Sequence, residues 1–219
     1  MLDKKRLYRN LKPSDNNLMT RYDFIANRFS DSIQAIAEHV DTLAPEIDQA
    51  ANLLSQSLLS DGKVLICGLG ADAATAELFT SYFINRFELE RPALPAINLA
   101  QGVSTTSSLV AGGAAADYFS RQIKALGRRE DTLVCLAHDI NHPAILKAVQ
   151  AAHEQELSVI ILASARLTDL LSLLIPTDVS IIISSERASI VYELEIMCIH
   201  RLLELVDQAL FFNTTGADS

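Results

Sequence analysis

The run of residues with the clearest chemical meaning is a glycine-containing loop, residues 68–72. It reads Gly-Leu-Gly-Ala-Asp and follows the apolar run 64–67. Glycines between a strand and a helix usually let backbone N–H groups wrap a phosphate at the helix start. This loop offers the carboxylate of Asp72 and contains no Ser or Thr. Gly68 and Gly70 are therefore interpreted as residues whose backbone freedom the turn needs.

A second polar run, residues 137–142, adds two imidazoles and a carboxylate. It contains His138, Asp139, Asn141 and His142. The Asp-x-x-His spacing from Asp139 to His142 is compatible with a weak metal site. Because such spacing often arises by chance, a polar loop is the preferred interpretation.

The last helical segment carries further candidate residues. His200 lies among apolar residues, where a histidine is more often a hydrogen-bonded core or interface residue than a ligand. Glu193 and Glu195 point to different faces of the helix. They are interpreted as a structural ion-pair partner and a solvated charge rather than a catalytic pair. Neither a metal nor a cofactor is expected from these patterns.

The elements that must position these residues are short apolar runs separated by helical patterns. This alternation predicts an α/β fold: a three-layer αβα sandwich around a five-stranded parallel sheet. Ligands of such sheets bind at the carboxyl ends of the strands. The expected strands are 64–67, 96–99, 132–136, 159–163 and 179–183, and the expected helices between them are 73–88, 117–126, 143–155 and 167–174.

Helices are also expected before and after the sheet. Ser30 can begin one helix and Pro45 a second, which together predict a helical hairpin. A long helix is expected over 188–211. The predicted organisation is a basic arm, residues 1–29, an α/β domain that includes the hairpin, residues 30–212, and a tail, residues 213–219.

Composition narrows the class of protein. The net charge of −9 argues against direct nucleic-acid binding, although residues 1–30 hold seven Lys/Arg against three Asp. No apolar stretch approaches the roughly 20 residues that cross a bilayer, and no signal-peptide pattern is visible at the start. Cys67, Cys135 and Cys198 lie in separate apolar runs and fit buried free thiols. A cytoplasmic protein without a membrane or nucleic-acid partner is expected.

Several runs resemble the SIS (sugar isomerase) domain family. The longest is Ile-Asn-Arg-Phe-Glu-Leu-Glu-Arg-Pro-Ala-Leu-Pro-Ala-Ile at 84–97. Others are 119–122 with 125–127, and 145–148, and all occur in the family's order. The resemblance covers most of residues 30–212. Within the family the chain is similar to the phosphoheptose isomerase branch. Its end, residues 205–211, most resembles the DiaA-type proteins, which associate with the replication initiator DnaA.

The resemblance also indicates where the family binds phosphate. A family serine matches Asp72, and in the Ser/Thr-rich family run that matches residues 137–142 only Asn141 is kept. Asp72 and Asp139 would then face the phosphate. Like charges about 4 Å apart in an intermediate dielectric cost several kcal/mol. Each phosphate oxygen left unpaired costs a further ~1–3 kcal/mol. Ordinary sugar phosphates are therefore not expected to bind unless a cation or the histidines compensate.

The family's metal and acid–base residues are also replaced. Its His and Glu match Leu78 and Tyr82, and its Gln matches Tyr192. Its second His is kept as His200, and Glu193 lies beside the Gln position. An aldose–ketose isomerase needs a positioned base and an oxygen polariser, and zinc needs three or four ligands. His200 and Glu193 are therefore expected to be vestigial.

These replacements favour a non-catalytic adaptor of the DiaA type. Leu210 and Phe211 match residues through which DiaA-type proteins contact DnaA. A homotetramer, or dimer of dimers, would present several copies of that surface. Two alternatives stay open. One is a phosphoheptose isomerase that converts sedoheptulose 7-phosphate, and the other is a sensor that binds a sugar derivative or amine in the old pocket.

Overall fold

A computed structural model describes residues 20–138 and 141–212 of the chain. They fall into two compact units that divide between residues 37 and 38. The first unit is described from residue 20 and consists of the beginning of helix α2 (Arg21–Leu59). The second unit holds the rest of α2 and the whole sheet. Most of the predicted basic arm, and all of the predicted tail, lie outside the described residues.

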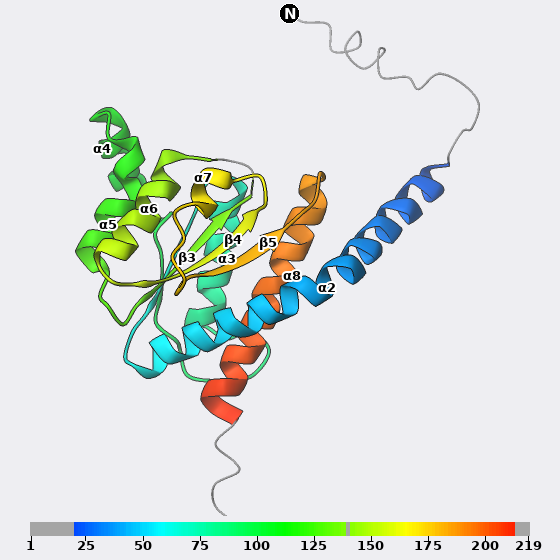
Figure 1. The fold of residues 1–219 in the computed structure, drawn as a ribbon, viewed down its shortest axis with the longest axis horizontal. Helices are drawn as coiled ribbons and strands as arrows, with labels where there is room; N and C mark the ends of the chain where they lie inside the picture. The colour runs from blue at the N-terminus through cyan, green and yellow to red at the C-terminus, as the bar shows by residue number, and fades with distance from the viewer. Residues whose placement is uncertain (1–19, 139–140, 213–219) are drawn as a thin grey trace, which may run out of the picture. The chain divides into compact units, whose positions relative to one another are not determined.

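Five parallel strands form the sheet, in the order β2-β1-β3-β4-β5 (Figure 1). Nearly every residue of the three central strands is buried, which is why their sequences are continuous apolar runs rather than alternating ones. The predicted strands are confirmed with ends shifted by at most one residue. Their bounds are β1 (Val64–Gly68), β2 (Ala96–Asn98), β3 (Thr132–Ala137), β4 (Ser158–Ser164) and β5 (Val179–Ile183).

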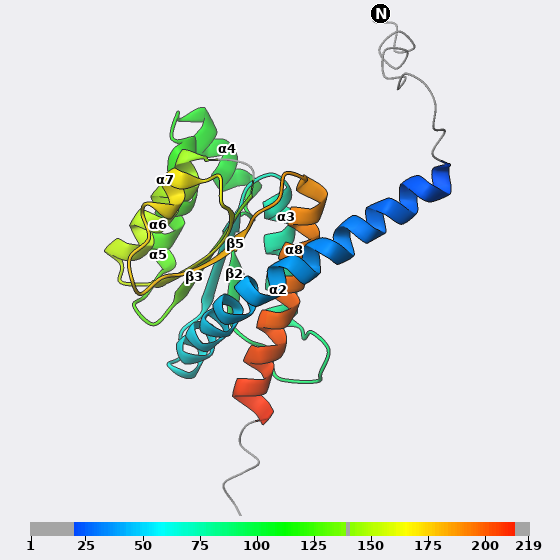
Figure 2. The ribbon, with the colours of Figure 1, turned by 45° about the vertical axis from the view of Figure 1, so that its right-hand side comes forward.

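Helices cover both faces of the sheet, so the predicted three-layer αβα sandwich is confirmed (Figures 1 and 2). Helices α5 (Tyr118–Leu126) and α6 (Pro143–Glu154) pack together on one face. Helices α3 (Ala71–Ile84) and α8 (Ala188–Asp207) pack together on the other. Within the described residues, no helix is both long enough and apolar enough to cross a bilayer.

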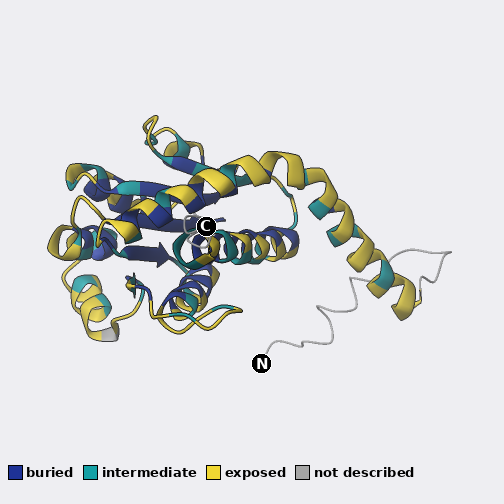
Figure 3. Ribbon diagram, turned by 90° about the horizontal axis from the view of Figure 1, so that it is seen from below, coloured by how far each residue is buried: buried dark blue, intermediate teal, exposed yellow. Residues whose placement is uncertain are grey.

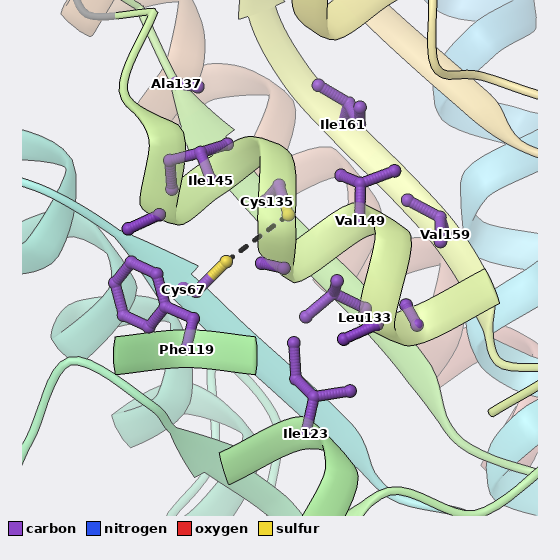
Figure 4. Packing of buried hydrophobic residues seen from close by; sticks show 14 of the residues in the cluster. Cys67, Phe119, Ile123, Leu133, Cys135, Ala137, Ile145, Val149, Val159 and Ile161 are labelled. Carbon is purple, nitrogen blue, oxygen red and sulfur yellow. Dashed lines mark hydrogen bonds between the residues drawn. The ribbon is translucent and has the colours of Figure 1, made fainter. Parts of the chain in front are cut away.

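The core between the sheet and α5–α6 is built from aliphatic residues, the rings of Tyr118 and Phe119, and a pair of thiols. Figure 4 shows Phe119 and the two thiols among the aliphatic side chains. Cys67 of β1 and Cys135 of β3 lie opposite each other, with their Sγ atoms 3.3 Å apart. The contact with Cys135 and burial raise the pKa of the Cys67 thiol well above its usual range. All three cysteines are free and buried, as the sequence predicts.

The predicted helical hairpin before the sheet is wrong, because α2 is one helix of 39 residues with Pro45 inside it. A proline in a helix interior costs about 3 kcal/mol. In the second unit a continuous stripe, Leu43, Ile47, Ala50 and Leu54, is buried at helical spacing (Figure 3). Burial of that stripe on both sides of the proline offsets the cost, so the helix continues through it.

Four short elements complete the described chain. Helix α4 is not predicted from the sequence, because its Ser- and Thr-rich run has low helix propensity. The final turn continues α8 to the predicted end of that helix, but with π-type spacing. The bounds are α4 (Val103–Ala111), η1 (Ala115–Asp117), α7 (Thr168–Leu171) and η2 (Gln208–Phe212).

Candidate functional site

The strand order reverses at β1, and this reversal locates the candidate site. From β1 the chain adds β2 on one side and then β3 on the other. In open parallel sheets ligands bind at such a switch point, outside the carboxyl ends of the strands. The loops that follow β1 and β3 are the two polar runs that the sequence singles out.

Gly68, the last residue of β1, and Gly70 allow α3 to begin directly at the end of that strand. A Cβ atom on Gly68 would lie 2.6 Å from the carbonyl oxygen of Asp72, which is far too close. Gly70 is the N-cap of α3 and has φ of +62°, a left-handed conformation that favours glycine. Both positions support the interpretation of these glycines as turn residues.

Asp72 lies in the first turn of α3 and contacts the loop after β3. Its Oδ2 accepts a hydrogen bond from the backbone N–H of His138 at 3.1 Å. Its Oδ1 lies 3.1 Å from Nδ1 of His138, which must carry the proton here because a carboxylate only accepts. Asp72 is 6% exposed and His138 is 2% exposed. The carboxylate of Asp72, which was predicted to face a phosphate, is thus hydrogen-bonded to His138 instead.

Glu195 of α8 is the third member of this group, and sequence reasoning missed it. It is fully buried, and its Oε1 lies 3.5 Å from Nδ1 of His138. Burial and the nearby Asp72 carboxylate raise the pKa of Glu195 to about 9, while the Thr75 hydroxyl acts in the opposite direction. The sequence-based interpretation, in which Glu193 and Glu195 are a structural ion-pair partner and a solvated charge, is therefore wrong for Glu195. The available signal was a carboxylate on the apolar face of a helix, four residues after Val191.

Asp72, His138 and Glu195 form one compact polar group. Each offers one ligand-type atom, and these atoms all lie within 4.8 Å of one another. Two elements from the switch point and one facing helix therefore bring together a carboxylate, an imidazole and a protonated carboxyl. Such a set can donate and accept protons, and it has the ligand types that a divalent cation prefers.

The rest of the second polar run has structural contacts. Nδ1 of His142 accepts a hydrogen bond from the N–H of Ala144 at 3.1 Å, so His142 caps α6. The Asn141 side chain donates to the carboxylate of Asp169. Asp139 lies outside the described residues, so its predicted place beside a phosphate stays a prediction. The polar-loop interpretation suits both described residues.

Of the four positions that match the family's metal set, only His200 keeps a ligand of the family, and Leu78, Tyr82 and Tyr192 are side chains of a different kind. His200 packs against Phe87 and Tyr82, with ring centroids 4.8 and 5.9 Å away, and its buried Nε2 has no hydrogen-bond partner among the described residues. Leu78 offers no ligand atom, and the ring of Tyr192 lies 5.6 Å from that of His138. One imidazole among phenols and a leucine does not fit zinc. We name Tyr82, Phe87 and His200 the aromatic cluster.

The other candidate residues of the carboxyl-terminal segment lie near the surface. Glu193 is exposed, as expected for a solvated charge. Leu210 and Phe211 are half-buried in η2, and Phe212 is 45% exposed. Whether Leu210 and Phe211 contact a partner stays a prediction.

The run 84–97, which carries much of the family resemblance, has a structural role in this fold. Arg91 donates hydrogen bonds to the backbone carbonyls of Tyr82 and Phe83 at 2.8 and 3.0 Å. Its Nε lies 2.6 Å from Oδ1 of Asp207, and both side chains are almost fully buried. Arg91 therefore ties this loop to the end of α3 and to the last turn of α8.

Comparisons with known proteins give a consistent result. A model of the SIS domain matches residues 28–164. The phosphoheptose isomerase of Azoarcus sp. is 35% identical over 86% of this chain and 96% of that protein. The phosphoheptose isomerase of Thiobacillus denitrificans is 38% identical over 88% and 98%. A solved phosphoheptose isomerase structure from Francisella tularensis superposes with a TM-score of 0.81, at 35% identity over 87% of this chain and all of that one.

These relatives overturn the prediction of a non-catalytic DiaA-type adaptor. They are named as isomerases, and the match to this chain covers nearly their whole length. They therefore support the isomerase alternative instead. The adaptor prediction rested on replaced loop residues, and it ignored the buried group that Glu195 completes. Particular similarity to DiaA is not supported by these comparisons. By sequence and by fold, the chain belongs to the SIS-domain family, in its phosphoheptose isomerase branch.

Proposed function

We propose that this chain is an aldose–ketose isomerase that acts on a phosphorylated seven-carbon sugar, with sedoheptulose 7-phosphate as the first substrate to test. The named activity of its relatives supports this proposal. The single observation that carries it on this chain is the Asp72–His138–Glu195 group at the switch point of the sheet.

The chemistry of the group suits proton transfer. Aldose–ketose isomerisation moves a proton between adjacent carbons, so it needs a base and a proton donor close together. Pairs of titratable groups whose environments push their pKa values apart often supply these roles. In the metal-free chain Glu195 has a pKa raised to about 9 and holds its proton at neutral pH, beside the Asp72 carboxylate and the His138 imidazole. Leu78, at a family position that otherwise carries His, can supply neither role.

Turnover of sedoheptulose 7-phosphate by the purified chain tests the proposal. The product would be followed by NMR, with zinc added in one arm and a chelator in the other. Conversion that Asp72→Asn abolishes supports the assignment, and Glu193→Gln is the matched control because Glu193 is exposed on α8. Absence of conversion in both arms would refute it.

A second candidate function is binding of a sugar derivative without turnover. The aromatic cluster favours it, because Tyr82 stands where the family resemblance expects a Glu, and the kept His200 packs against the rings of Tyr82 and Phe87. Sedoheptulose 7-phosphate that raises the melting temperature without being converted would select this function over the first.

We also propose that the protein is a homotetramer and works in the cytoplasm. Tyr22, Ile25, Phe29 and Ile33 recur at helical spacing on the described part of the first unit, and each is more than half exposed. Such an apolar stripe is typical of a contact surface. Light scattering would give four times the chain mass of 23.9 kDa. Free buried thiols support a reducing compartment.

A further inference from the structure

The Asp72–His138–Glu195 group has an unbalanced charge. It contains two carboxyl groups and one imidazole, and each residue is at most 6% exposed. A protonated imidazole neutralises only one carboxylate. Because an unpaired charge is costly to bury, the second carboxylate must hold either a proton or a cation.

Two of the three separations in the group match a metal site, and the third is no longer than 4.8 Å. Zinc bound to N and O ligands at roughly 2.0–2.1 Å in a tetrahedron places neighbouring ligand atoms about 3.3 Å apart. Nδ1 of His138 lies 3.1 Å from Oδ1 of Asp72 and 3.5 Å from Oε1 of Glu195. Three ligands with a fourth position open is the usual arrangement of a catalytic zinc ion.

An independent observation concerns hydrogen bonding. Both side-chain oxygens of Glu195 are buried and have no hydrogen-bond partner of ordinary geometry among the described residues. Buried polar atoms are almost always satisfied, so an unpartnered carboxyl directed at a carboxylate and an imidazole calls for a ligand. A cation among the three residues would satisfy it.

We propose that Asp72, His138 and Glu195 bind one zinc ion, at a site distinct from the positions of Leu78, Tyr82, Tyr192 and His200. On binding, Nδ1 of His138 and the carboxyl of Glu195 each give up a proton to solvent, so that an imidazole protonated at Nε2 and two carboxylates hold the ion. The ligands come from the first turn of α3, the loop after β3 and the middle of α8.

The role of this ion rests on the proposed function. Asp72 matches a family phosphate-binding position, where a bare carboxylate would repel a phosphorylated sugar. A divalent cation would cancel that repulsion, and its open position could bind a phosphate oxygen. Binding of sedoheptulose 7-phosphate should therefore depend on zinc.

Metal content and affinity of the full-length chain test the site. After chelator treatment and removal of the chelator, we expect one zinc per chain by mass spectrometry and calorimetry, and a raised melting temperature. Glu195→Gln should weaken zinc binding by at least about tenfold. Glu193→Gln, on the exposed face of the same helix, should bind zinc as the natural chain does.

The controls keep the outcomes separate. Circular dichroism must show that Glu195→Gln is folded, and Asp72→Asn provides a second test if it is not. A natural chain that binds no zinc, or a folded Glu195→Gln variant that binds it unchanged, would overturn the site. Zinc binding without any turnover would refute the proposed isomerase and leave the site standing. Turnover that persists in metal-free protein would refute the role of the ion in substrate binding and leave the isomerase standing.

Discussion

Two groups of side chains beside helix α8 differ sharply in chemistry. The Asp72–His138–Glu195 group contains three titratable side chains and an unpartnered carboxyl. The aromatic cluster contains one imidazole packed against two rings that also contact each other. Glu195 and His200 are only five residues apart on one helix. The comparison teaches that a family position can lose its chemistry to packing while another buried group on the same helix acquires titratable residues.

The largest expected effect is on turnover. Asp72→Asn should lower kcat/KM for sedoheptulose 7-phosphate by at least about 100-fold, because it removes the charged acceptor of the group. Tyr82→Phe, in the aromatic cluster, should change it less than about threefold, since the ring is kept. Steady-state kinetics measure both. Equal losses of kcat/KM in the two variants would show that the Asp72–His138–Glu195 group is no more important for turnover than the aromatic cluster.

The next effect is a pH dependence of stability in metal-free protein. The folded pKa of Glu195 is raised from 4.5 to about 9. The folded state therefore binds more protons than the unfolded state between these values, and stability falls as pH rises through that range, by several kcal/mol in total. Glu195→Gln should remove this slope, whereas Glu193→Gln should keep it. Urea unfolding at several pH values, with chelator present, measures the slopes. A natural chain with the same slope as Glu195→Gln would contradict this prediction.

A smaller effect is expected at the loop that begins α3. Gly70 has φ of +62° and no atom within 4 Å of where a Cβ would lie. Gly70→Ala should therefore destabilise the protein by about 1–2 kcal/mol through backbone strain alone. Gly68→Ala should cost more, because its Cβ would clash with the backbone of Asp72. Urea midpoints give both values, and the reverse order would argue against this loop geometry.

The smallest effect is expected in the aromatic cluster. Because Nε2 of His200 is buried without a partner among the described residues, His200→Phe should keep stability within about 1 kcal/mol or raise it. Zinc binding should be unchanged. Loss of zinc binding in His200→Phe would show that the ion binds at the aromatic cluster and not at the Asp72–His138–Glu195 group.

The fold could be predicted from the sequence because its signals are local and strong. Continuous apolar runs such as 132–136 mark strands buried on both faces, and turns or helix starts bound them. Helix α4 was not predicted because its residues have low helix propensity. The predicted helical hairpin was wrong because a proline ends a helix only when burial of the flanking residues does not offset its cost. Both errors arise where tertiary packing overrides local preference.

The candidate site could be predicted only in part. Asp72 and His138 follow neighbouring strands, so their approach follows from the switch point alone. Glu195 reaches them from a helix more than 50 residues later, and its depth depends on how α8 lies against α3. The adaptor prediction failed for the same reason. Replaced residues at positions matched to the family do not reveal that the fold brings the carboxyl of Glu195 close to Asp72 and His138.

The buried thiols have a practical consequence. Cys67 and Cys135 have no contact with solvent, and Cys198, whose pKa burial raises to about 12, is almost as inaccessible. Alkylating reagents attack thiolates, so none of the three should be labelled while the chain is folded. The rate of iodoacetamide incorporation at each cysteine would then report how often the sheet or helix α8 opens. The three native cysteines can therefore report local opening of the fold without any engineered labelling site.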